Sequence, residues 1–316
     1  MASVVAITGG TGFIGRHLVA RHVSLGDQVH YLTRKKPAEE IQGAVAHIGN
    51  LAAPETLRRF VRGADVLYHC AAELRDVAEM EKTNVMGTAN LLDAAVGEVG
   101  RWVQLSSTGV YGALRDGEVR EDADIRPGNP YERSKALADA LVLEAADKQN
   151  LSCALLRPSN VYGEDMPNQS LFQLIRMIDK GQFFFIGPRG AMANYIHVEN
   201  VVDAMLACAN ATLPANGRAY IASDHCPLEE FVGIIAATLG KQVPRMRLPE
   251  MPVRALVAAC GWLPGVPLKT SRIDALTNRT TYCTERIRDE LGHCNRISMA
   301  SGMGKLVGYW KEHAAH

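Results

Sequence analysis

Thr8-Gly9-Gly10-Thr11-Gly12-Phe13-Ile14-Gly15 is the stretch of this 316-residue chain from which the fold can be inferred. The apolar residues 4–7 before it are typical of a buried parallel strand, and the residues after it carry apolar side chains at helical spacing. The glycines have both the G-x-G-x-x-G and the G-x-x-G-x-x-G spacing. Such a strand, turn and helix bring backbone N–H groups close to a pyrophosphate. The stretch therefore predicts a dinucleotide site that includes Gly9, Gly12, Phe13, Ile14 and Gly15.

The composition favours an enzyme with a small-molecule substrate. Lysine plus arginine and aspartate plus glutamate both number 34, so no net field draws the chain to nucleic acid or to an anionic membrane. The seven cysteines are scattered and contain no C-x-x-C pair, which is typical of thiols in a reducing compartment. The ten histidines have no metal-ligand spacing. We therefore expect a cytoplasmic protein with no nucleic-acid partner and no metal.

One apolar stretch, residues 251–266, has to be weighed as a membrane segment. Pro252, Arg254 and Pro264 interrupt it, and it is too short to span a bilayer. No integral membrane segment is expected, although the stretch could line an apolar pocket or touch a membrane surface.

Strand-like and helix-like patterns alternate along the first half of the chain. Strands are predicted at residues 4–7, 29–33, 45–51, 64–72, 102–105 and 155–158. This alternation predicts right-handed βαβ units in a doubly wound parallel sheet, an α/β fold that binds its ligands at the carboxyl ends of the strands.

The end of the second predicted strand, Thr33-Arg34-Lys35-Lys36, bears on the choice of cofactor. Proteins that bind NAD usually have an acidic residue about twenty residues beyond the glycines, where it accepts hydrogen bonds from the ribose 2′-hydroxyl. No carboxylate stands here, and Thr33, Arg34 and Lys35 suit a 2′-phosphate instead. We predict NADP, with NAD as the alternative cofactor and a solvated basic loop as the interpretation without a ligand.

Two other strand ends are expected to contact the cofactor. Asn50 and Leu51 follow the third strand, where an adenine ring would lie and Asn50 could hydrogen-bond its edge. Ala71 and Ala72 end the fourth strand, and their small side chains would let the cofactor approach the backbone.

The fifth predicted strand leads into candidate catalytic residues. It continues into Ser106 and Ser107, and farther on Asn129-Pro130 opens a helix with an Asn cap and Pro at its first position. Tyr131 and Lys135 are four residues apart on that helix and therefore share a face.

A tyrosine beside a lysine suits hydride transfer, because a proton must move on or off the substrate oxygen as the hydride moves. A phenol with a pKa of about 10 serves near neutrality only if its pKa falls by about three units. One ammonium about 5 Å away contributes on the order of 3 kcal/mol at an effective dielectric near 20, so Lys135 is almost sufficient.

These motifs together resemble the extended short-chain dehydrogenase/reductase superfamily, in its NAD(P)-dependent epimerase/dehydratase group. The resemblance rests on the glycine stretch, Ser107 upstream of Val110-Tyr111-Gly112, Tyr131-Glu132-Arg133-Ser134-Lys135, and residues 84–88, 157–163 and 195–201. It implies a Rossmann fold with a smaller C-terminal substrate-binding domain. It also implies that Ser107, Tyr131 and Lys135 are catalytic, with Ser106 as the alternative to Ser107. The further positions that it assigns are Asn84, Ser106, Tyr131, Lys135 and Pro158 for the cofactor, and Asn160 and Ser107 for the substrate.

The resemblance further suggests a division of the chain. The nucleotide-binding domain would comprise residues 1–160 and 190–212, and the substrate-binding domain residues 161–189 and 213–316. Members that use nucleotide sugars usually have an arginine two residues before the position of Tyr195, and this chain has Ala193. Arg189 could bind the substrate in its place.

Three functions follow from the resemblance. The first is an NADP(H)-dependent oxidoreductase or epimerase that acts on a hydroxyl or keto carbon of a nucleotide sugar. The second is the same chemistry on a sterol-like or other apolar alcohol or ketone, as in the 3β-hydroxysteroid dehydrogenase-like branch. The third is a non-catalytic NADP-sensing regulator, which would not need Ser107, Tyr131 and Lys135. A homodimer through the helices around residues 84–95 and 131–146 is also expected.

Overall fold

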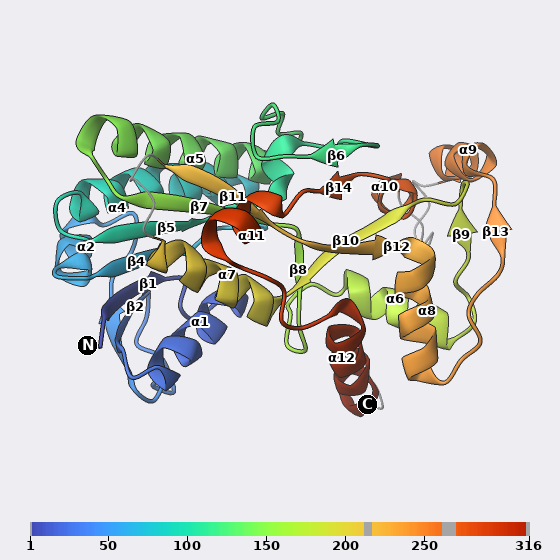
Figure 1. Ribbon diagram of the computed structural model, residues 1–316, viewed down its shortest axis with the longest axis horizontal. Helices are drawn as coiled ribbons and strands as arrows, with labels where there is room; N and C mark the ends of the chain where they lie inside the picture. The colour runs from blue at the N-terminus through green and yellow to red at the C-terminus, as the bar shows by residue number, and fades with distance from the viewer. Residues whose placement is uncertain (1, 212–216, 261–269, 314–316) are drawn as a thin grey trace.

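The computed structural model describes residues 2–211, 217–260 and 270–313, which form two lobes along one long axis (Figure 1). The larger lobe is built on a seven-stranded parallel sheet in the order β11-β7-β5-β4-β1-β2-β3. The strands are β1 (Val4–Thr8), β2 (Gln28–Thr33), β3 (Ala44–Ile48), β4 (Val66–His69), β5 (Arg101–Leu105), β7 (Cys153–Pro158) and β11 (Arg218–Ala222). The strand order reverses at β1, so the predicted doubly wound α/β fold is confirmed.

Helices cover both faces of this sheet. On one face lie α1 (Phe13–Ser24), α7 (Val198–Asn210) and α11 (Glu285–Leu291). On the other lie α2 (Pro54–Val61), α4 (Gly87–Ala95) and α5 (Pro130–Gln149). Each face has its own buried apolar cluster, one including Leu18 and Met205 and the other Trp102 and Val142. The central strands are consequently buried on both sides, as their continuous apolar sequences require.

The smaller lobe surrounds a second apolar core. Its sheet consists of β10 (Met192–His197), which pairs in parallel with β8 (Asn160–Tyr162) and antiparallel with β12 (Asp224–Pro227). Around it pack α6 (Ser170–Asp179), α8 (Leu228–Leu239) and α12 (Met299–His313). The far end of the lobe carries β9 (Phe185–Ile186), β13 (Arg247–Leu248), α9 (Glu250–Cys260) and α10 (Thr270–Thr277).

Two segments lie on the other side of the predicted domain boundaries. Residues 218–222 were assigned to the substrate-binding domain, but β11 pairs with β7 at the edge of the large sheet. The segment that contains β10 was assigned to the nucleotide-binding domain, but β10 pairs only with strands of the small sheet. Local sequence patterns did not determine either position, because each depends on which distant strand is the partner. Residue 1 and residues 212–216, which these boundaries include, lie outside the described part of the chain.

Five further elements are short. They are α3 (Val77–Met80), the π-helix η1 (Glu81–Met86), the 3₁₀-helix η2 (Thr108–Tyr111), and the strand pair β6 (Glu118–Val119) with β14 (Thr281–Tyr282). Among the described residues, no helix is long and apolar enough to cross a membrane.

The glycine turn between β1 and α1 is closed by the amide of Gly12, which donates to the carbonyl of Gly9 at 2.8 Å. Gly9 has a φ of 69°, and a Cβ there would lie 2.7 Å from the amide nitrogen of Ala71. A Cβ at Gly15 would overlap the carbonyl oxygen of Gly9. The turn can therefore approach β4 and begin α1 only with glycine at these positions.

Replacing Gly15 by alanine should destabilise the protein, because the new methyl group has to displace backbone. We expect Gly15→Ala to lower the free energy of unfolding, measured with urea, by about 1–3 kcal/mol. Gly308→Ala in α12 is the matched control, since its Cβ would meet nothing within 4 Å. The control should be neutral or stabilising by about 0.5–1 kcal/mol. Equal losses in the two variants would contradict this description of the turn.

Candidate active site

A buried line of hydrogen bonds ties the glycine turn to the neighbouring strand and helix. The hydroxyl of Thr8 accepts from the amide of Ala71 at 3.2 Å and lies 2.7 Å from Nδ1 of His69. Nε2 of His69 lies 2.9 Å from the hydroxyl of Thr88, which donates to the carbonyl of Asn84 at 2.6 Å. All donors and acceptors match if His69 is neutral with its proton on Nε2. Burial, with the nearby charge of Lys135, lowers the pKa of His69 to about 3, which agrees with that form.

The glycine turn fits a dinucleotide pyrophosphate. The start of α1 has no acidic residue in its first turn and no side chain capping its amide groups. Side chains at Gly9 and Gly15 would fill the space that the turn leaves. Phe13 of the same turn packs against the core of the smaller lobe, and Ile14 packs against the core of the larger one. The turn thus offers amide donors to an anion at the junction of the lobes.

The second part of the site is the segment after β5, which contacts the start of α5. The hydroxyl of Ser107 accepts from the amide of Gly109 at 3.1 Å and keeps its own hydrogen for another acceptor. The side chain of Asn129 caps α5 by accepting from the amide of Glu132 at 2.9 Å. A Cβ at Gly109 would lie 3.0 Å from the side chain of Glu132, so the strand end and the helix start touch. Tyr131 directly precedes Glu132 in the first turn of α5 and is half-buried.

Lys135 joins the helix to the strand end. Its buried ammonium donates to the carbonyl of Leu105, the last residue of β5. Burial lowers the pKa of Lys135, while the nearby Asp139 and Cys70 raise it. Cys70 directly follows β4, so the ammonium lies by the ends of two neighbouring strands, one turn of α5 beyond Tyr131.

The expected lowering of the phenol pKa by Lys135 is not found. Burial, with smaller contributions from the charges of Asp139 and Glu132, raises the pKa of Tyr131 to about 12. The physical reason is that the ammonium faces the Leu105 carbonyl and Asp139. The phenol is therefore protonated at neutral pH in the chain by itself.

The main residue that the sequence analysis missed is Asp139, which is buried one turn beyond Lys135 on α5. One carboxylate oxygen accepts from Ser106 at 2.8 Å and from Nε of Arg157 at 3.1 Å. The other oxygen is buried without a hydrogen-bond partner. Arg157 in turn donates to the hydroxyl of Tyr111 at 2.8 Å. The spacing of four residues after Lys135 was a signal, but only the fold shows what the carboxylate faces.

This cluster distinguishes the two candidate serines. The hydroxyl of Ser106 points to Asp139 and is buried, whereas Ser107 is partly exposed and free to donate. The carboxylate that Ser106 contacts also interacts electrostatically with Lys135. The geometry therefore favours Ser107 over Ser106 as the residue that meets a substrate oxygen.

Asn84 supports the site from the π-helix η1. Its side-chain oxygen accepts from the amide of Glu73 at 2.6 Å, and its nitrogen donates to Ser134 at 2.9 Å and to the Glu73 carbonyl at 3.0 Å. Ser134 lies between Tyr131 and Lys135 and donates to the carbonyl of Tyr131. Asn84, which was predicted to contact the cofactor, has a buried side-chain amide that joins the loop after β4 to α5.

The residues predicted to bind the adenosine half of the dinucleotide lie at the ends of β2 and β3, on one side of the sheet. Arg34 and Lys35 are exposed, and Thr33 donates to the carbonyl of Lys35 at 2.9 Å. Asn50 uses its side-chain oxygen to accept from the amide of Ala52 at 3.1 Å, which leaves its NH₂ group. The side chain of Leu51 belongs to the buried core, and its carbonyl accepts from Asn90 at 2.8 Å.

The remaining predicted contacts lie near the junction of the lobes. Ala71 and Ala72 are partly buried, and Pro158 is buried at the end of β7. Asn160 is exposed and donates to the carbonyl of Asn194 at 3.1 Å. Arg189 is exposed, and its carbonyl accepts from Arg279 at 3.3 Å. A second arginine that sequence reasoning did not select therefore lies beside Arg189.

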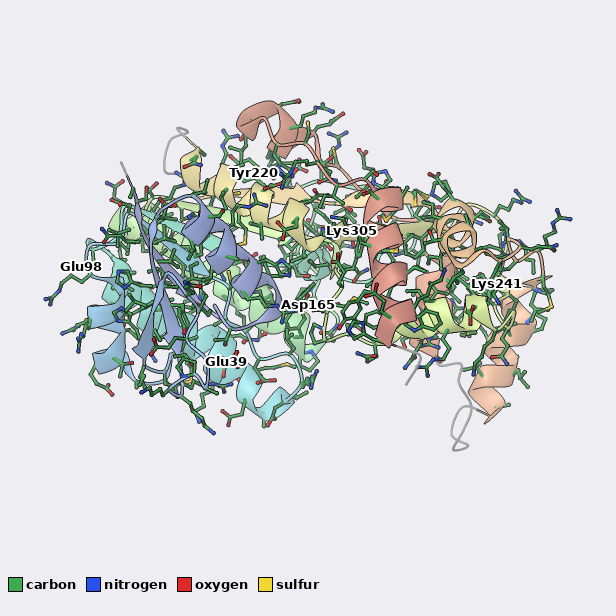
Figure 2. All side chains as sticks on the ribbon, turned by 90° about the horizontal axis from the view of Figure 1, so that it is seen from below. Glu39, Glu98, Asp165, Tyr220, Lys241 and Lys305 are labelled. Atoms are coloured by element: carbon green, nitrogen blue, oxygen red, sulfur yellow. The ribbon has the colours of Figure 1, made fainter. Side chains whose placement is uncertain are left out.

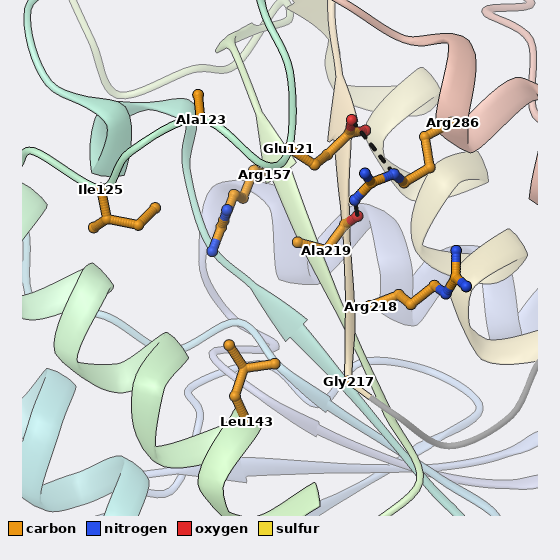
Figure 3. A pocket seen from close by; sticks show the side chains of 9 residues that line it. All are labelled: Glu121, Ala123, Ile125, Leu143, Arg157, Gly217, Arg218, Ala219 and Arg286. Atoms are coloured by element: carbon orange, nitrogen blue, oxygen red, sulfur yellow. Dashed lines mark hydrogen bonds and ion pairs between the residues drawn. The ribbon is translucent and has the colours of Figure 1, made fainter. Parts of the chain in front are cut away.

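A separate surface pocket of about 440 Å³ lies at the edge strand β11 (Figure 3). It is bounded by the edge strand β11 and includes Arg157 in its wall, but the residues that line it include none of the predicted site residues. Its cations have partners, since Arg286 lies 3.6 Å from Glu121 and Arg218 pairs with Glu290 at 2.5 Å. Within the described ranges, no group of three metal-ligating side chains occurs.

Comparisons with known proteins agree with this arrangement. The model of the NAD dependent epimerase/dehydratase family matches residues 5–222. A relative from Stigmatella aurantiaca, 4-hydroxy-2-methyl-3-oxo-4-farnesyl-3,4-dihydroquinoline-1-oxide ketoreductase, is 30% identical, and the match covers 95% of this chain and 94% of the relative. The 3beta-hydroxysteroid-dehydrogenase/decarboxylase isoform 1 of Arabidopsis thaliana is 28% identical over 95% of this chain and 78% of its own. The structure of MoeE5 in complex with UDP-glucuronic acid and NAD has a TM-score of 0.75 at 25% identity, over 98% of this chain and 99% of that one.

The buried carboxylate of Asp139 should be essential to the stability of the site. Asp139→Asn leaves Arg157 and Lys135 as buried cations without a counter-charge, and we expect the free energy of unfolding to fall by about 3–5 kcal/mol. Ser106→Ala is the matched control, because it removes one hydrogen bond to the same carboxylate and should cost about 1–2 kcal/mol. Urea unfolding of both variants measures the difference. A loss in Asp139→Asn no larger than that in Ser106→Ala would show that the carboxylate does not neutralise the two cations.

Proposed function

Because the chain belongs to the NAD dependent epimerase/dehydratase family, within the extended short-chain dehydrogenase/reductase superfamily, we propose that it transfers a hydride between a nicotinamide dinucleotide and a hydroxyl or keto carbon. The observation that carries this proposal is that Lys135 reaches the end of β5, and that the start of α5, which bears Tyr131, touches the segment that contains Ser107. These strand ends lie on the edge of the sheet where the glycine turn lies. The smaller lobe is proposed to bind the substrate.

Each of the three residues has a distinct role in this proposal. When bound, the cofactor donates or accepts the hydride and, in its oxidised form, carries a positive charge that favours an ionised phenol. The phenol of Tyr131 donates or accepts the proton at the substrate oxygen. Lys135 adds positive charge from beneath, held in place by the Leu105 carbonyl, and Ser107 donates a hydrogen bond to the oxygen as charge develops there. Burial lowers the pKa of that lysine, and the charge of Asp139 opposes this lowering.

Removing the phenol oxygen tests this role directly and also tests the regulator alternative, under which the wild-type protein would show no turnover. Tyr131→Phe should lower turnover by about 10²–10⁴-fold, because the proton loses its donor, while the dissociation constant for NADPH stays nearly unchanged. Tyr309→Phe on α12 is the control and should behave as wild type. Full activity in Tyr131→Phe would end the assignment.

We propose NADP as the preferred cofactor. The support is that β2 ends without a carboxylate and that Arg34, Lys35 and Lys36 are exposed beside it. Hydrogen bonds from the Arg75 and Asp76 amides lower the pKa of Glu73, in the loop after β4, and the charge of Arg34 makes a smaller contribution. Arg34 therefore lies near that loop. The arginine is thus near the strand ends where a ribose phosphate would bind. NAD, which is bound in the MoeE5 structure, is the alternative.

This preference should depend on Arg34. NADPH should bind about tenfold or more tightly than NADH, since a hydrogen bond to a charged group contributes about 1.5–3 kcal/mol, and Arg34→Ala should remove the difference. Arg62→Ala, an exposed cation after α2, is the control and should keep it. Fluorescence titration of the reduced cofactors measures both constants. Equal constants in the wild type would contradict the proposal.

Two substrate classes are supported by different observations. A nucleotide sugar is supported by the likeness to MoeE5 and by Arg189 and Arg279, which lie side by side and could bind a diphosphate. An apolar alcohol or ketone is supported by the ketoreductase relative and by Ala193, which is buried in β10 where an arginine would be expected. Arg189 lies on the loop before β10, so it would approach a substrate diphosphate from a different direction than a residue at position 193 of that strand.

A thermal-shift panel separates the two classes. Uridine and thymidine diphosphate sugars and a set of sterols and prenylated quinones, each with NADP(H), should stabilise the protein only where they bind. Arg279→Ala should abolish a shift caused by the diphosphate sugars and leave a shift caused by apolar ligands. A protein that responds to no sugar would exclude the first class, and one that responds to no apolar ligand would exclude the second.

We also propose a homodimer in the cytoplasm. The dimer would form through α4 and α5. Its support is two exposed apolar side chains: Met86, at the start of α4, is 58% exposed, and Leu137, on α5, is 52% exposed. The location is supported by Cys70, Cys153, Cys208, Cys226, Cys283 and Cys294, which are free thiols.

A further inference from the structure

The helix α9 lies at the end of the molecule farthest from the N-terminal strands (Figure 1). Figure 2 shows Lys241, which shortly precedes β13, toward this end and Glu98 at the opposite one. One side of α9 is buried, where Val253 and Val257 pack with Ile186 and Ile273. The helix is therefore anchored to the smaller lobe by one face and presents the other to the surroundings.

The charged residues of α9 all belong to its inner side. Arg254 pairs with Glu250 at 2.7 Å and with Asp274 of α10 at 2.8 Å. The outer face is left with apolar side chains: Met251 is 76% exposed and Leu256 is 64% exposed, and Pro252, Ala255 and Ala258 are exposed beside them. This is the reverse of the usual surface helix, which turns its charges outward.

The segment before the helix continues this surface. Val243 is 49% exposed and Met246 is 55% exposed, and β13 joins them to α9 with only Pro249 between. We call Val243, Met246, Met251 and Leu256 the tip surface. Single exposed apolar residues are ordinary, but four large ones within fourteen consecutive residues at one end of the molecule indicate an interaction site.

Cations surround the tip surface, although the whole chain is neutral. Residues 241–260 contain four cations, Lys241, Arg245, Arg247 and Arg254, and a single carboxylate, Glu250. Lys241 and Arg247 have partners on other elements, Asp179 at 3.4 Å and Glu229 at 2.6 Å. Arg245 is exposed and makes no hydrogen bond or ion pair with any residue that the structure describes. Its charge, between Val243 and Met246, is therefore available to an external anion.

We propose that the tip surface docks on an anionic phospholipid bilayer, with α9 lying in the plane of the interface. An α9 of 11 residues is about 16 Å long, too short to span a bilayer but suited to lie on one. The apolar side chains enter the boundary of the acyl chains, and Arg245 and Lys241 remain at the level of the phosphates. A second copy of the chain is a poorer partner for this surface, because it would bring a second Arg245 to the surface and, within residues 241–260, no free carboxylate to pair with it. The proposal does not depend on the substrate or on the hydride chemistry.

Sedimentation with lipid vesicles tests the proposal on the full chain. Wild-type protein should bind vesicles of phosphatidylcholine with phosphatidylserine, more weakly as salt is raised and more weakly to phosphatidylcholine alone. Met251→Glu with Leu256→Glu should lower the partition coefficient about tenfold or more, because carboxylates replace the inserted side chains. Arg245→Gln should lower binding to the anionic vesicles only.

The matched control is Leu25→Glu with Val45→Glu, two side chains of the larger lobe that are 58% and 54% exposed. This variant should bind vesicles as the wild type does. Both double variants should keep the wild-type dissociation constant for NADPH and the thermal midpoint, which shows that they fold. The proposal is overturned if wild-type protein stays in solution, if both double variants lose binding equally, or if light scattering shows that the α9 variant dissociates a dimer without changing vesicle binding.

Discussion

The structure depends most on one buried contact, between the ammonium of Lys135 and the carbonyl of Leu105. It joins the first turns of α5 to the end of β5, so the helix that carries Tyr131 has a fixed position above the edge of the sheet. A buried ammonium is costly unless it is hydrogen-bonded and neutralised, and Asp139 supplies the counter-charge. Arg157 on the neighbouring strand β7 holds Asp139 in turn. The start of α5, which bears the proposed catalytic residues, is thus held by a buried charge network.

A second network holds the other side of the site. Thr8 at the glycine turn, His69 at the end of β4 and Thr88 in α4 form a line of matched hydrogen bonds, and Asn84 extends it to α5. The glycine turn and α5 are therefore connected through buried polar groups as well as through the sheet. Such fully satisfied networks specify one arrangement of a core, because any shift leaves a buried polar group without a partner.

Local spacing was sufficient to select candidate site residues, and their roles in binding and catalysis stay a prediction. The glycine turn, Ser107, Tyr131 and Lys135 could be selected because their order and spacing are set by a turn, a strand end and one face of a helix. Asp139 and His69 were missed because their roles depend on which distant groups they face, and nothing local distinguishes them from ordinary polar residues. The edge strand β11 was missed for a similar reason: its partner β7 is far away in the sequence. The pKa of Tyr131 also required the fold, because burial and the charges of Asp139 and Glu132 raise it.

A crystal structure of the protein with bound NADPH is the measurement that tests the central claim most directly. The phenol oxygen of Tyr131 should face the nicotinamide ring within reach of a substrate oxygen, with the ammonium of Lys135 on the nicotinamide ribose and the hydroxyl of Ser107 on the opposite side of the substrate position. A phenol that points into bulk water, or a nicotinamide ring bound away from the ends of β4 and β5, would contradict it.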